Sequence, residues 1–459
     1  MNFAIIFLNI FHMKTLLVLP NTLEKLSSNR LKEFHKIIIV EHPHYFTRVN
    51  FHKQKLVLHR ASMKSYESEL IKVGTRVQYV EVHEYSKFNL TNTEEIVAID
   101  PIETKVKKDL LKKFKVEFIE NKTFLYNNED LESFHQNVKD KQRISHKTFY
   151  NWSLDKQPKL RQIIDKNLDA LNRKVYAGNP IYKSKINRSR FVIAAIKYVE
   201  THFRNNYGST ATFSYPINHA QAKNILKKFL DERLLHFGDF QDSINFDDPV
   251  LYHSMLSSSL NIGLLTPSEV VKAALKTWNA NHHKIKKNNF EGFIRQIIGW
   301  REYMHYIYVF HEGELLDSNI LGLNNKLNTS WWTGETPLEP VNRVVEQTLE
   351  SAYMNHIQRL MVVLNAMILS EIRAGDILKW FTELSIDAYD WVMISNVYAM
   401  GGFNDKFMSR PYISSSKYLV NMGIEKGEWE QVWDDLYRKF VCKKRGTVPS
   451  LKFYSARCD

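Results

Sequence analysis

Short apolar runs alternate with longer mixed stretches over the first 130 residues of the chain. The runs are rich in β-branched residues and lie at 13–19, 36–41, 76–82, 94–100 and 115–120. Strands of this kind, separated by segments long enough for helices, are typical of a parallel sheet with helices on its faces. The pattern therefore predicts an α/β domain over residues 13–130 and leaves residues 1–12 as an extra N-terminal tail.

A helical period of three to four residues takes over at about residue 190 and continues to the end. The segments 190–203, 219–237 and 290–310 each show one apolar face. The polar, turn-rich stretch between the two patterns, 131–185, predicts a linker between domains. We therefore expect an α/β plus all-α architecture, with an all-helical domain over residues 186–459.

One predicted helix carries polar side chains on its apolar face. Apolar residues recur from Val345 to Met367 at helical spacing, and His356 lies within this stripe with Arg359 one turn further along. Polar groups on an inner face must be paired or must serve a ligand. If the helix is considered alone, His356 can be explained as a core histidine with a hydrogen-bond partner. Asn355, the residue before it, is expected to point about 100° away from the stripe.

The 459-residue chain has a formal net charge of +13 and a pI of about 9.3. This surplus suits a polyanion such as nucleic acid, although solvated lysine-rich faces would give the same balance. Two cysteines, Cys442 and Cys458, are too few for a disulfide framework or a four-thiolate cluster and favour a reducing compartment. The apolar N-terminus lacks a basic start and is interrupted by polar residues, so we expect neither a signal peptide nor a membrane span. An intracellular, soluble protein is the expectation.

Three segments of the helical region carry candidate chemistry, each with an ordinary structural explanation beside it. The serines of LYHSMLSSSLNIGLL (251–265) could hold a phosphate at a helix N-terminus or simply cap that helix. The stretch IRQIIGWREYMHY (294–306) fits a core helix with an internal salt bridge. Asp387 and Asp390 could share general acid–base work or lie on a helix surface. The sequence contains no glycine-rich dinucleotide motif, P-loop or zinc pattern.

Taken together and in this order, these motifs resemble the photolyase/cryptochrome superfamily over nearly the whole chain. The matching stretches include FHKQKLVLHRASM (51–63), LDERLLHFGDFQDSI (230–244), EGFIRQIIGWREY (291–303), WWTGETPL (331–338), AYMNHIQRLMV (352–362) and SRPYISSSKYLVNM (409–422). The sequence is most similar to the iron–sulfur branch of bacterial (6-4) photolyases and prokaryotic cryptochromes. The resemblance implies a Rossmann-like antenna domain, a helical domain that binds FAD, and light-driven electron transfer to a flipped lesion in UV-damaged DNA.

The resemblance also assigns roles to individual residues. The implied FAD contacts are His253, Ser254, Leu256, Ser257, Arg301, Met393 and an ion pair between Arg359 and Asp387. The implied lesion contacts are Gln296, Trp300, Asn355 and His356. Trp332 and Trp380 match tryptophans that carry electrons to the flavin, and Asn21 and Glu41 match residues that hold a second, antenna chromophore of the ribityl-lumazine type. A monomer with a DNA-facing loop at 148–160 is expected as well.

The residue at position 356 decides which substrate the resemblance implies. Superfamily enzymes that repair cyclobutane dimers carry asparagine there, whereas (6-4) enzymes carry a histidine that donates a proton. A (6-4) photolyase is therefore the leading hypothesis. The alternatives are a cyclobutane-dimer photolyase, favoured if Asn355 faces the lesion, and a cryptochrome-like photoreceptor without repair activity.

Two departures from the branch change the expected chemistry. The cysteines that bind its [4Fe–4S] cluster are missing, with Pro340 at one of their positions, so we expect no cluster and packing by Trp429 and Trp433 in its place. Met393 stands where the branch has a glutamate that faces the flavin. A thioether cannot take up a proton or donate a strong hydrogen bond.

Overall fold

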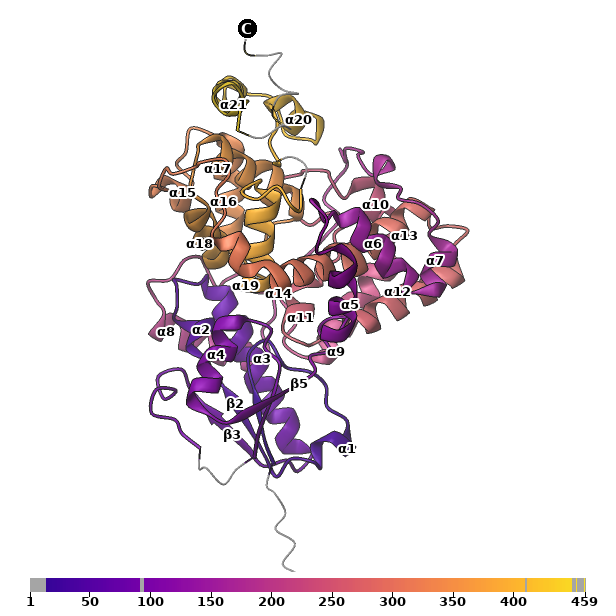
Figure 1. The fold of residues 1–459 in the computed structure, drawn as a ribbon. Coiled ribbons are helices and arrows are strands. Elements are labelled where there is room, and N and C mark those ends of the chain that lie inside the picture. Colours follow the sequence, from indigo (N-terminus) through magenta and orange to yellow (C-terminus); the bar gives the residue numbers. More distant parts are fainter. Residues whose placement is uncertain (1–13, 91–94, 409–410, 448–450, 452–457, 459) are drawn as a thin grey trace, which may run out of the picture.

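The computed structural model of the protein describes residues 14–90, 95–408, 411–447, 451 and 458. The predicted N-terminal tail, residues 1–12, lies outside this part of the chain. Figure 1 shows a sheet layer built from the N-terminal part of the chain and a larger body of helices above it. The expected α/β plus all-α fold class is confirmed.

Five parallel strands form one sheet in the order β3-β2-β1-β4-β5. They are β1 (Lys14–Val18), β2 (Lys36–Val40), β3 (Val77–Val80), β4 (Glu95–Ile99) and β5 (Val116–Ile119), and each lies in one of the predicted apolar runs. The inner strands β1, β2 and β4 are buried along nearly their whole length. The order of strands reverses at β1, and the carboxyl ends of β1 and β4 form the switch point where doubly wound sheets usually bind ligands.

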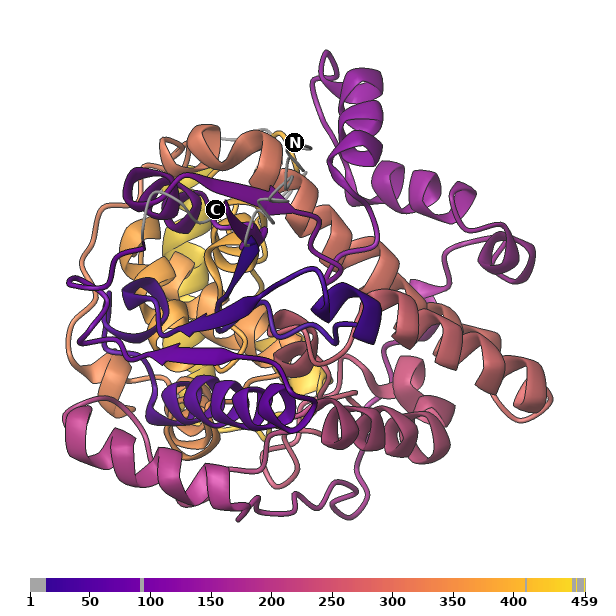
Figure 2. The ribbon, with the colours of Figure 1, turned by 90° about the horizontal axis from the view of Figure 1, so that it is seen from below.

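The sheet is covered by helices from two distant parts of the sequence. The local ones are α1 (Ser28–Leu31), α2 (Pro43–Phe46), α3 (Lys53–Lys72) and α4 (Thr104–Lys113). Helix α8 (Arg190–His202) packs side by side with α3 on the outside of this layer (Figure 2). By contact α8 therefore joins the sheet layer, although its residues lie in the range predicted for the helical domain.

The segment predicted as a linker, 131–185, is largely helical in its first half. It contains most of α5 (Asn128–Val138), all of α6 (His146–Asp155) and α7 (Pro158–Ile163), and the short turn η1 (Asp169–Leu171). The Ser145 hydroxyl accepts a hydrogen bond from the Thr148 amide and caps α6, and Pro158 starts α7. The expected loop at 148–160 is wrong because serine and proline that begin a helix have the same appearance in sequence as residues that form a turn.

The helical body follows the predicted period. Its elements are α9 (His219–Lys228), η2 (Phe229–Arg233), η3 (Leu234–His236), α10 (Phe237–Phe240), α11 (Ser257–Asn261), α12 (Pro267–Asn281), α13 (Lys287–Ile294), η4 (Arg295–Arg301), α14 (Glu302–Leu316), α15 (Ser330–Thr333), α16 (Glu339–Ser351), η5 (Gln358–Leu364), α17 (Asn365–Leu369), α18 (Ala374–Leu384), α19 (Asp390–Ile394), η6 (Ser395–Met400), α20 (Ser416–Asn421) and α21 (Trp429–Lys444). Segments η4, η5 and η6 are π-helical turns that continue directly from or into α-helices. None of the described helices is long and apolar enough to cross a membrane.

The helix expected to run unbroken from Val345 to Met367 is interrupted. Helix α16 ends at Ser351, Ala352 adopts a left-handed backbone with φ of 57°, and the chain becomes helical again at His356. Glycine usually occupies such a position, so an alanine there gives no sequence signal for the break. The prediction of one continuous apolar stripe containing His356 is therefore wrong.

Polar side chains at the start of α3 connect the sheet layer to the helical body. Donors from this region reach four backbone carbonyls: the His52 amide donates to Glu383, its ring to Leu349, Gln54 to Glu350, and the Lys55 ammonium to Ala388. One turn further along, His59 Nε2 lies 2.8 Å from the Tyr389 hydroxyl. These contacts bury the polar face of α3, and they fix the sheet layer against the chain on either side of residue 387.

Helix α21 carries Trp429 and Trp433, the two residues that we expected to pack in place of an iron–sulfur cluster. Trp429 and Trp433 are buried and pack edge to face, with ring centroids 6.0 Å apart, and Trp433 donates to the Ser414 carbonyl. Cys442 and Cys458 are joined in a disulfide. We expected a reducing compartment, where structural disulfides are uncommon, and this pairing does not fit that expectation.

Candidate functional site

Two adjoining hollows, of about 250 and 390 Å³, form one cavity in the helical body. Their linings share Ser254, Ser257 and Asp387. The walls come from α11, from the turn before it and from the π-helical segments η4, η5 and η6. Because π-helical turns recur at functional sites and large cavities bind ligands, this cavity is the candidate site.

The expected pair between Arg359 and Asp387 is present on the cavity wall. Arg359 Nη2 lies 2.6 Å from Asp387 Oδ1, and the Ser257 hydroxyl also donates to Asp387. Burial alone would raise the pKa of Asp387, but the guanidinium and the hydroxyl outweigh it and lower the pKa. The carboxylate therefore stays charged although its residue is only 7% exposed, and each buried charge depends on the other.

Residues 251–257 form a strained turn along the cavity. Leu251 and Met255 have left-handed backbones, with φ of 46° and 60°, which is uncommon for residues other than glycine. The turn brings Ser254, Leu256 and Ser257 to the cavity surface. The serines implied by the resemblance, Ser254 and Ser257, therefore lie together on one wall.

His253 supports this turn from the same cavity. Its ring nitrogens lie 2.8 Å from the Val250 carbonyl oxygen and 3.0 Å from the Gln241 carbonyl oxygen. Burial lowers its pKa to about 4. The imidazole is therefore neutral near pH 7 and carries a single N–H, so it donates to one of these two carbonyls and supports the turn through that hydrogen bond.

Arg301 supplies positive charge to the lining of the larger hollow. Its guanidinium donates to Asn261 Oδ1 and, over 3.0 Å, to the Thr123 carbonyl, and it lies against the rings of Phe124 and Trp391. Burial lowers its pKa to about 10, so it remains charged at neutral pH. Among the described residues, neither Arg301 Nε nor Gln241 Oε1, both buried beside this wall, has a hydrogen-bond partner. Unsatisfied polar atoms around a large cavity fit a polar cofactor such as FAD.

Asn355 and His356 have different roles in the structure. Asn355 begins the helical turn: its Oδ1 accepts from the Gln358 amide over 2.9 Å, and Gln358 Oε1 accepts from the Asn355 amide over 3.1 Å. Its Nδ2 donates one of its two hydrogens to the Pro249 carbonyl, and the residue, which lines one hollow, is only 3% exposed. His356 lies on the cavity lining with 36% of its side chain exposed, and its Nε2 is 3.3 Å from Asp242 Oδ1. Of the two, His356 has the side chain that is free to meet a ligand.

The other implied contacts lie around the same cavity. Gln296 lines both hollows, the buried Met393 lines one, and Trp300 lines the other. Trp300 stacks on His146 with ring centroids 3.7 Å apart, so α6 contributes an aromatic support to the wall.

The two implied electron-transfer tryptophans lie behind the cavity and not in its lining. Trp380 is fully buried, contacts the cavity residue Phe381 edge to face, and donates to the Trp331 carbonyl over 2.8 Å. Trp332, which follows Trp331 in the chain, is half-buried, and its indole N–H donates to Glu383. The order cavity, Phe381, Trp380 and the 331–332 segment leads outward.

The two residues implied for an antenna chromophore lie in the sheet layer, and most of their polar atoms are engaged. Asn21 donates to the Pro101 carbonyl, and its Oδ1 is buried without a partner among the described residues. Glu41 is fully buried and accepts from Arg60, the Tyr79 hydroxyl and the Val82 amide at 2.7 to 3.1 Å. The antenna role of this pair stays a prediction.

Several residues of the site could not be identified from the sequence. Asn261 links the Asp387 carbonyl to Arg301, and Asp242 faces His356. Both residues lie in sequence motifs described above. Asn261 could have been noticed because it is a polar residue on the apolar side of a short helix, where it needs a partner. Asp390, considered together with Asp387 for acid–base work, does not line the cavity and pairs with Arg48 instead.

Known proteins match this chain in sequence and in fold. A family model described as deoxyribodipyrimidine photo-lyase-related protein matches residues 16–215. A (6-4) photolyase of Agrobacterium fabrum is 39% identical over 229 residues, which cover 50% of this chain and 45% of that protein. The match thus spans less than half the length of this relative.

Two viral proteins and one solved structure extend the comparison. The uncharacterized proteins R855 and R853 of Acanthamoeba polyphaga mimivirus are 48% and 34% identical over 85 and 111 residues, covering 69% and 84% of those proteins and 18% and 24% of this chain. The crystal structure of a bacterial class III photolyase from Agrobacterium tumefaciens superposes with a TM-score of 0.56 and covers 93% of this chain and 97% of that one. At 15% identity this likeness concerns the fold.

Proposed function

The chain belongs to the photolyase superfamily, and we propose that it is a light-dependent DNA repair enzyme that uses FAD and acts on pyrimidine (6-4) photoproducts. The observation that carries the proposal is the grouping of His356, Arg359 and Asp387 on one cavity. A proton-exchanging side chain, a buried ion pair and a large lined cavity are the parts that this chemistry needs.

The residues that would hold FAD surround the cavity on several sides. Ser254 and Ser257 offer hydroxyl groups, and Arg301 offers a buried guanidinium with an unused Nε donor for the phosphates. When bound in reduced form, FAD supplies one electron to a substrate on absorbing light. The Arg359–Asp387 pair keeps a positive group beside the cavity without leaving a buried charge unpaired, and it would favour an electron-rich cofactor bound there.

His356 would hold and deliver the proton that a (6-4) photoproduct requires. Its side chain is partly exposed at the cavity, while Asp242 contacts Nε2 and restricts the orientation of the ring. Imidazole is the side chain that exchanges protons most readily near neutral pH. Since the electron returns after the rearrangement, the repair involves no net oxidation or reduction of the lesion.

A net charge of +13 suits a partner made of phosphates. A flipped lesion would enter the cavity past His356 and the Trp300–His146 stack, which offers an aromatic face to a base. UV-damaged DNA is therefore the partner we propose.

The test uses the full chain, loaded with FAD and reduced, and two oligonucleotides, one with a (6-4) photoproduct and one with a cyclobutane dimer. We expect blue or near-ultraviolet light to remove the (6-4) photoproduct and leave the dimer, and a dark sample to leave both. Chromatography of the nucleosides after digestion measures each lesion directly.

Each outcome assigns the function. Loss of the dimer alone would replace the proposal with a cyclobutane-dimer photolyase. Survival of both lesions, in protein whose flavin absorption shows full loading and reduction, would favour a photoreceptor that does not repair DNA.

A further inference from the structure

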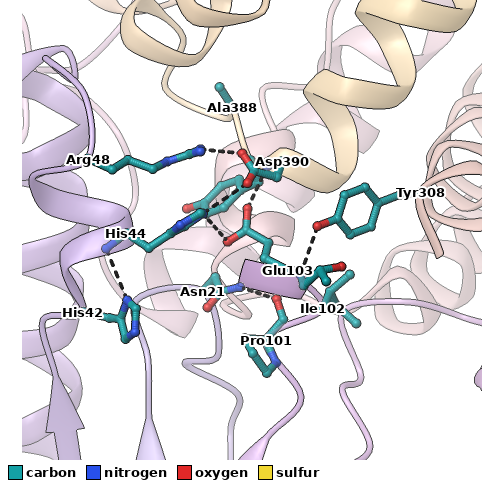
Figure 3. Close-up of polar contacts among 12 residues, drawn as sticks. Asn21, His42, His44, Arg48, Pro101, Ile102, Glu103, Tyr308, Ala388 and Asp390 are labelled. Atoms are coloured by element: carbon teal, nitrogen blue, oxygen red, sulfur yellow. Dashed lines mark hydrogen bonds and ion pairs between the residues drawn. The ribbon is translucent and has the colours of Figure 1, made fainter. Parts of the chain in front are cut away.

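A second group of buried polar residues lies outside the cavity, at the switch point of the sheet. His44 lies in α2 after β2, Glu103 lies between β4 and α4, and Asp390 is the first residue of α19. Figure 3 shows the three side chains converging where the carboxyl edge of the sheet meets the helical body. Their exposed fractions are 8%, 0% and 2%.

One atom of each side chain points into the group. His44 Nε2 lies 3.3 Å from Asp390 Oδ2 and 3.5 Å from Glu103 Oε2, and the three atoms all lie within 4.8 Å of one another. None of the three makes a well-aligned hydrogen bond among the described residues, although the buried Tyr45 hydroxyl interacts with Glu103 and His44 interacts with Asp390. Buried carboxylate oxygens without partners are costly, so their convergence needs an explanation.

The other atoms of the same side chains are held by neighbours. Glu103 Oε1 accepts from the Asp390 amide over 2.6 Å, and Asp390 Oδ1 accepts from Arg48 Nη2 over 2.5 Å. Ile102, just before Glu103, has a left-handed backbone with φ of 68°, a rare conformation for a β-branched residue. These contacts aim the remaining carboxylate oxygens at His44, in the way that hydrogen bonds from neighbouring residues orient the ligands of a metal.

We propose that His44, Glu103 and Asp390 bind a divalent transition-metal ion that joins the sheet layer to the helical body. Nitrogen and oxygen ligands suit Zn²⁺, with ligand bonds of about 2.0 to 2.2 Å. Ligands of a tetrahedral ion at that distance lie roughly 3.4 Å apart, close to the two separations from His44 Nε2. Two carboxylates balance the double charge of the ion, and Arg48, which donates to Asp390 Oδ1, holds that carboxylate in place.

A charged His44 bridging the two carboxylates would be the competing arrangement. Charge-assisted N–H···O bonds are about 2.7 to 2.9 Å long, shorter than either separation here. The two arrangements differ in one measurable respect, since only the first responds to a metal ion.

The test titrates Zn²⁺ by calorimetry into the full-length, flavin-loaded protein after dialysis against a chelator. We expect one tightly bound equivalent in the wild type and at least a 100-fold weaker affinity in His44→Gln and in Glu103→Gln. His83→Gln is the matched control, because His83 is an exposed histidine whose side chain is 67% accessible and lies beside Glu81; its affinity should equal that of the wild type.

X-ray absorption at the zinc edge keeps the proposal testable even if a variant fails to fold. The wild type loaded with one equivalent should show a nitrogen and oxygen shell with a single imidazole. A wild type that binds no Zn²⁺ at tens of micromolar, a shell with two or more imidazoles, or folded His44→Gln and Glu103→Gln variants that bind as tightly as the wild type would each overturn the proposal.

Discussion

His356 Nε2 lies 3.3 Å from Asp242 Oδ1, at the point where the two hollows of the cavity adjoin. The two residues come from segments 114 positions apart, so the contact restricts the histidine from outside its own helix. His356 is thus partly exposed to the cavity and held on one side, which is the condition for a side chain that must meet a substrate in one orientation.

Replacing this histidine should separate repair from flavin binding. His356→Asn is expected to lower (6-4) repair at least 100-fold, because general acid catalysis contributes about 10² to 10⁴ in rate. Flavin content should be unchanged, since the ion pair and the serine turn are intact. Repair kinetics on a (6-4) oligonucleotide and the flavin absorption spectrum give the two values. His283→Asn, at an exposed histidine, should leave both unchanged, and a fully active His356→Asn would refute the assigned role.

Asn355 should matter for the helix more than for the chemistry. Asn355→Ala removes the cap on the Gln358 amide, which costs about 1 kcal/mol. We expect a melting temperature lowered by a few degrees and repair that falls less than in His356→Asn. Asn218→Ala is the matched control, because Asn218 caps α9 in the same way through Gln221. If Asn355→Ala abolished repair with no more loss of stability than Asn218→Ala, Asn355 would be the residue that faces the lesion.

Breaking the buried ion pair should cost more than breaking an exposed one. Arg359→Ala leaves the Asp387 carboxylate buried without its main partner, which we expect to lower the free energy of unfolding by about 3 kcal/mol. Flavin retention after gel filtration should fall with it. Arg373→Ala breaks the exposed Arg373–Asp376 pair and should cost less than about 1 kcal/mol. Equal losses in chemical denaturation would show that the Arg359–Asp387 pair is not specially stabilising.

Glu302 should make stability depend on pH in an unusual direction. Burial raises its pKa to about 8, with Arg301 beside it acting in the opposite sense. Because the folded state keeps a proton that the unfolded carboxyl has already lost, the contribution of Glu302 to stability is present at low pH and is lost as the pH rises toward 8. Glu302→Gln should remove this loss, on the order of 2 kcal/mol between pH 5.5 and 8.

Melting curves of the wild type and Glu302→Gln across this range measure the difference. The variant should be the more stable protein at pH 8 and should differ least at pH 5.5. Glu346→Gln, at an exposed position of α16, should follow the wild-type curve. Parallel curves for the wild type and Glu302→Gln would mean that Glu302 is charged in the folded protein.

The strands and the general helical character of the chain could be predicted because each depends on a local pattern. A buried parallel strand such as Ile37–Val40 is continuously apolar, and the helix around Ile297 has a clear period. The break at Ala352 could not be predicted, because an alanine with a left-handed backbone has no mark in sequence. Ser145 and Pro158 were ambiguous for a related reason, since helix caps and turns use the same residues.

Some contacts of the candidate site could likewise be predicted from the sequence, and others could not. Arg359 and Asp387 could be paired from the resemblance, and they do pair. The partner of His356, Asp242, and the cluster of His44, Glu103 and Asp390 could not be found, because they join segments up to 346 residues apart and no periodicity connects them. Such contacts depend on how the two layers meet, which a single sequence does not state.

Helix α3 makes these two layers poor candidates for exchange between related proteins. A chimera that kept the helical body and received a foreign sheet layer would lose the donors that now reach Leu349, Glu350, Glu383 and Ala388. Those carbonyls belong to the segments that carry Ala352 and Asp387. A substitution in α3, far from the cavity, would therefore change the position of the cavity wall. The sheet layer and the helical body therefore have to change together, and a variant selected for a new sheet surface would need compensating changes in the helical body.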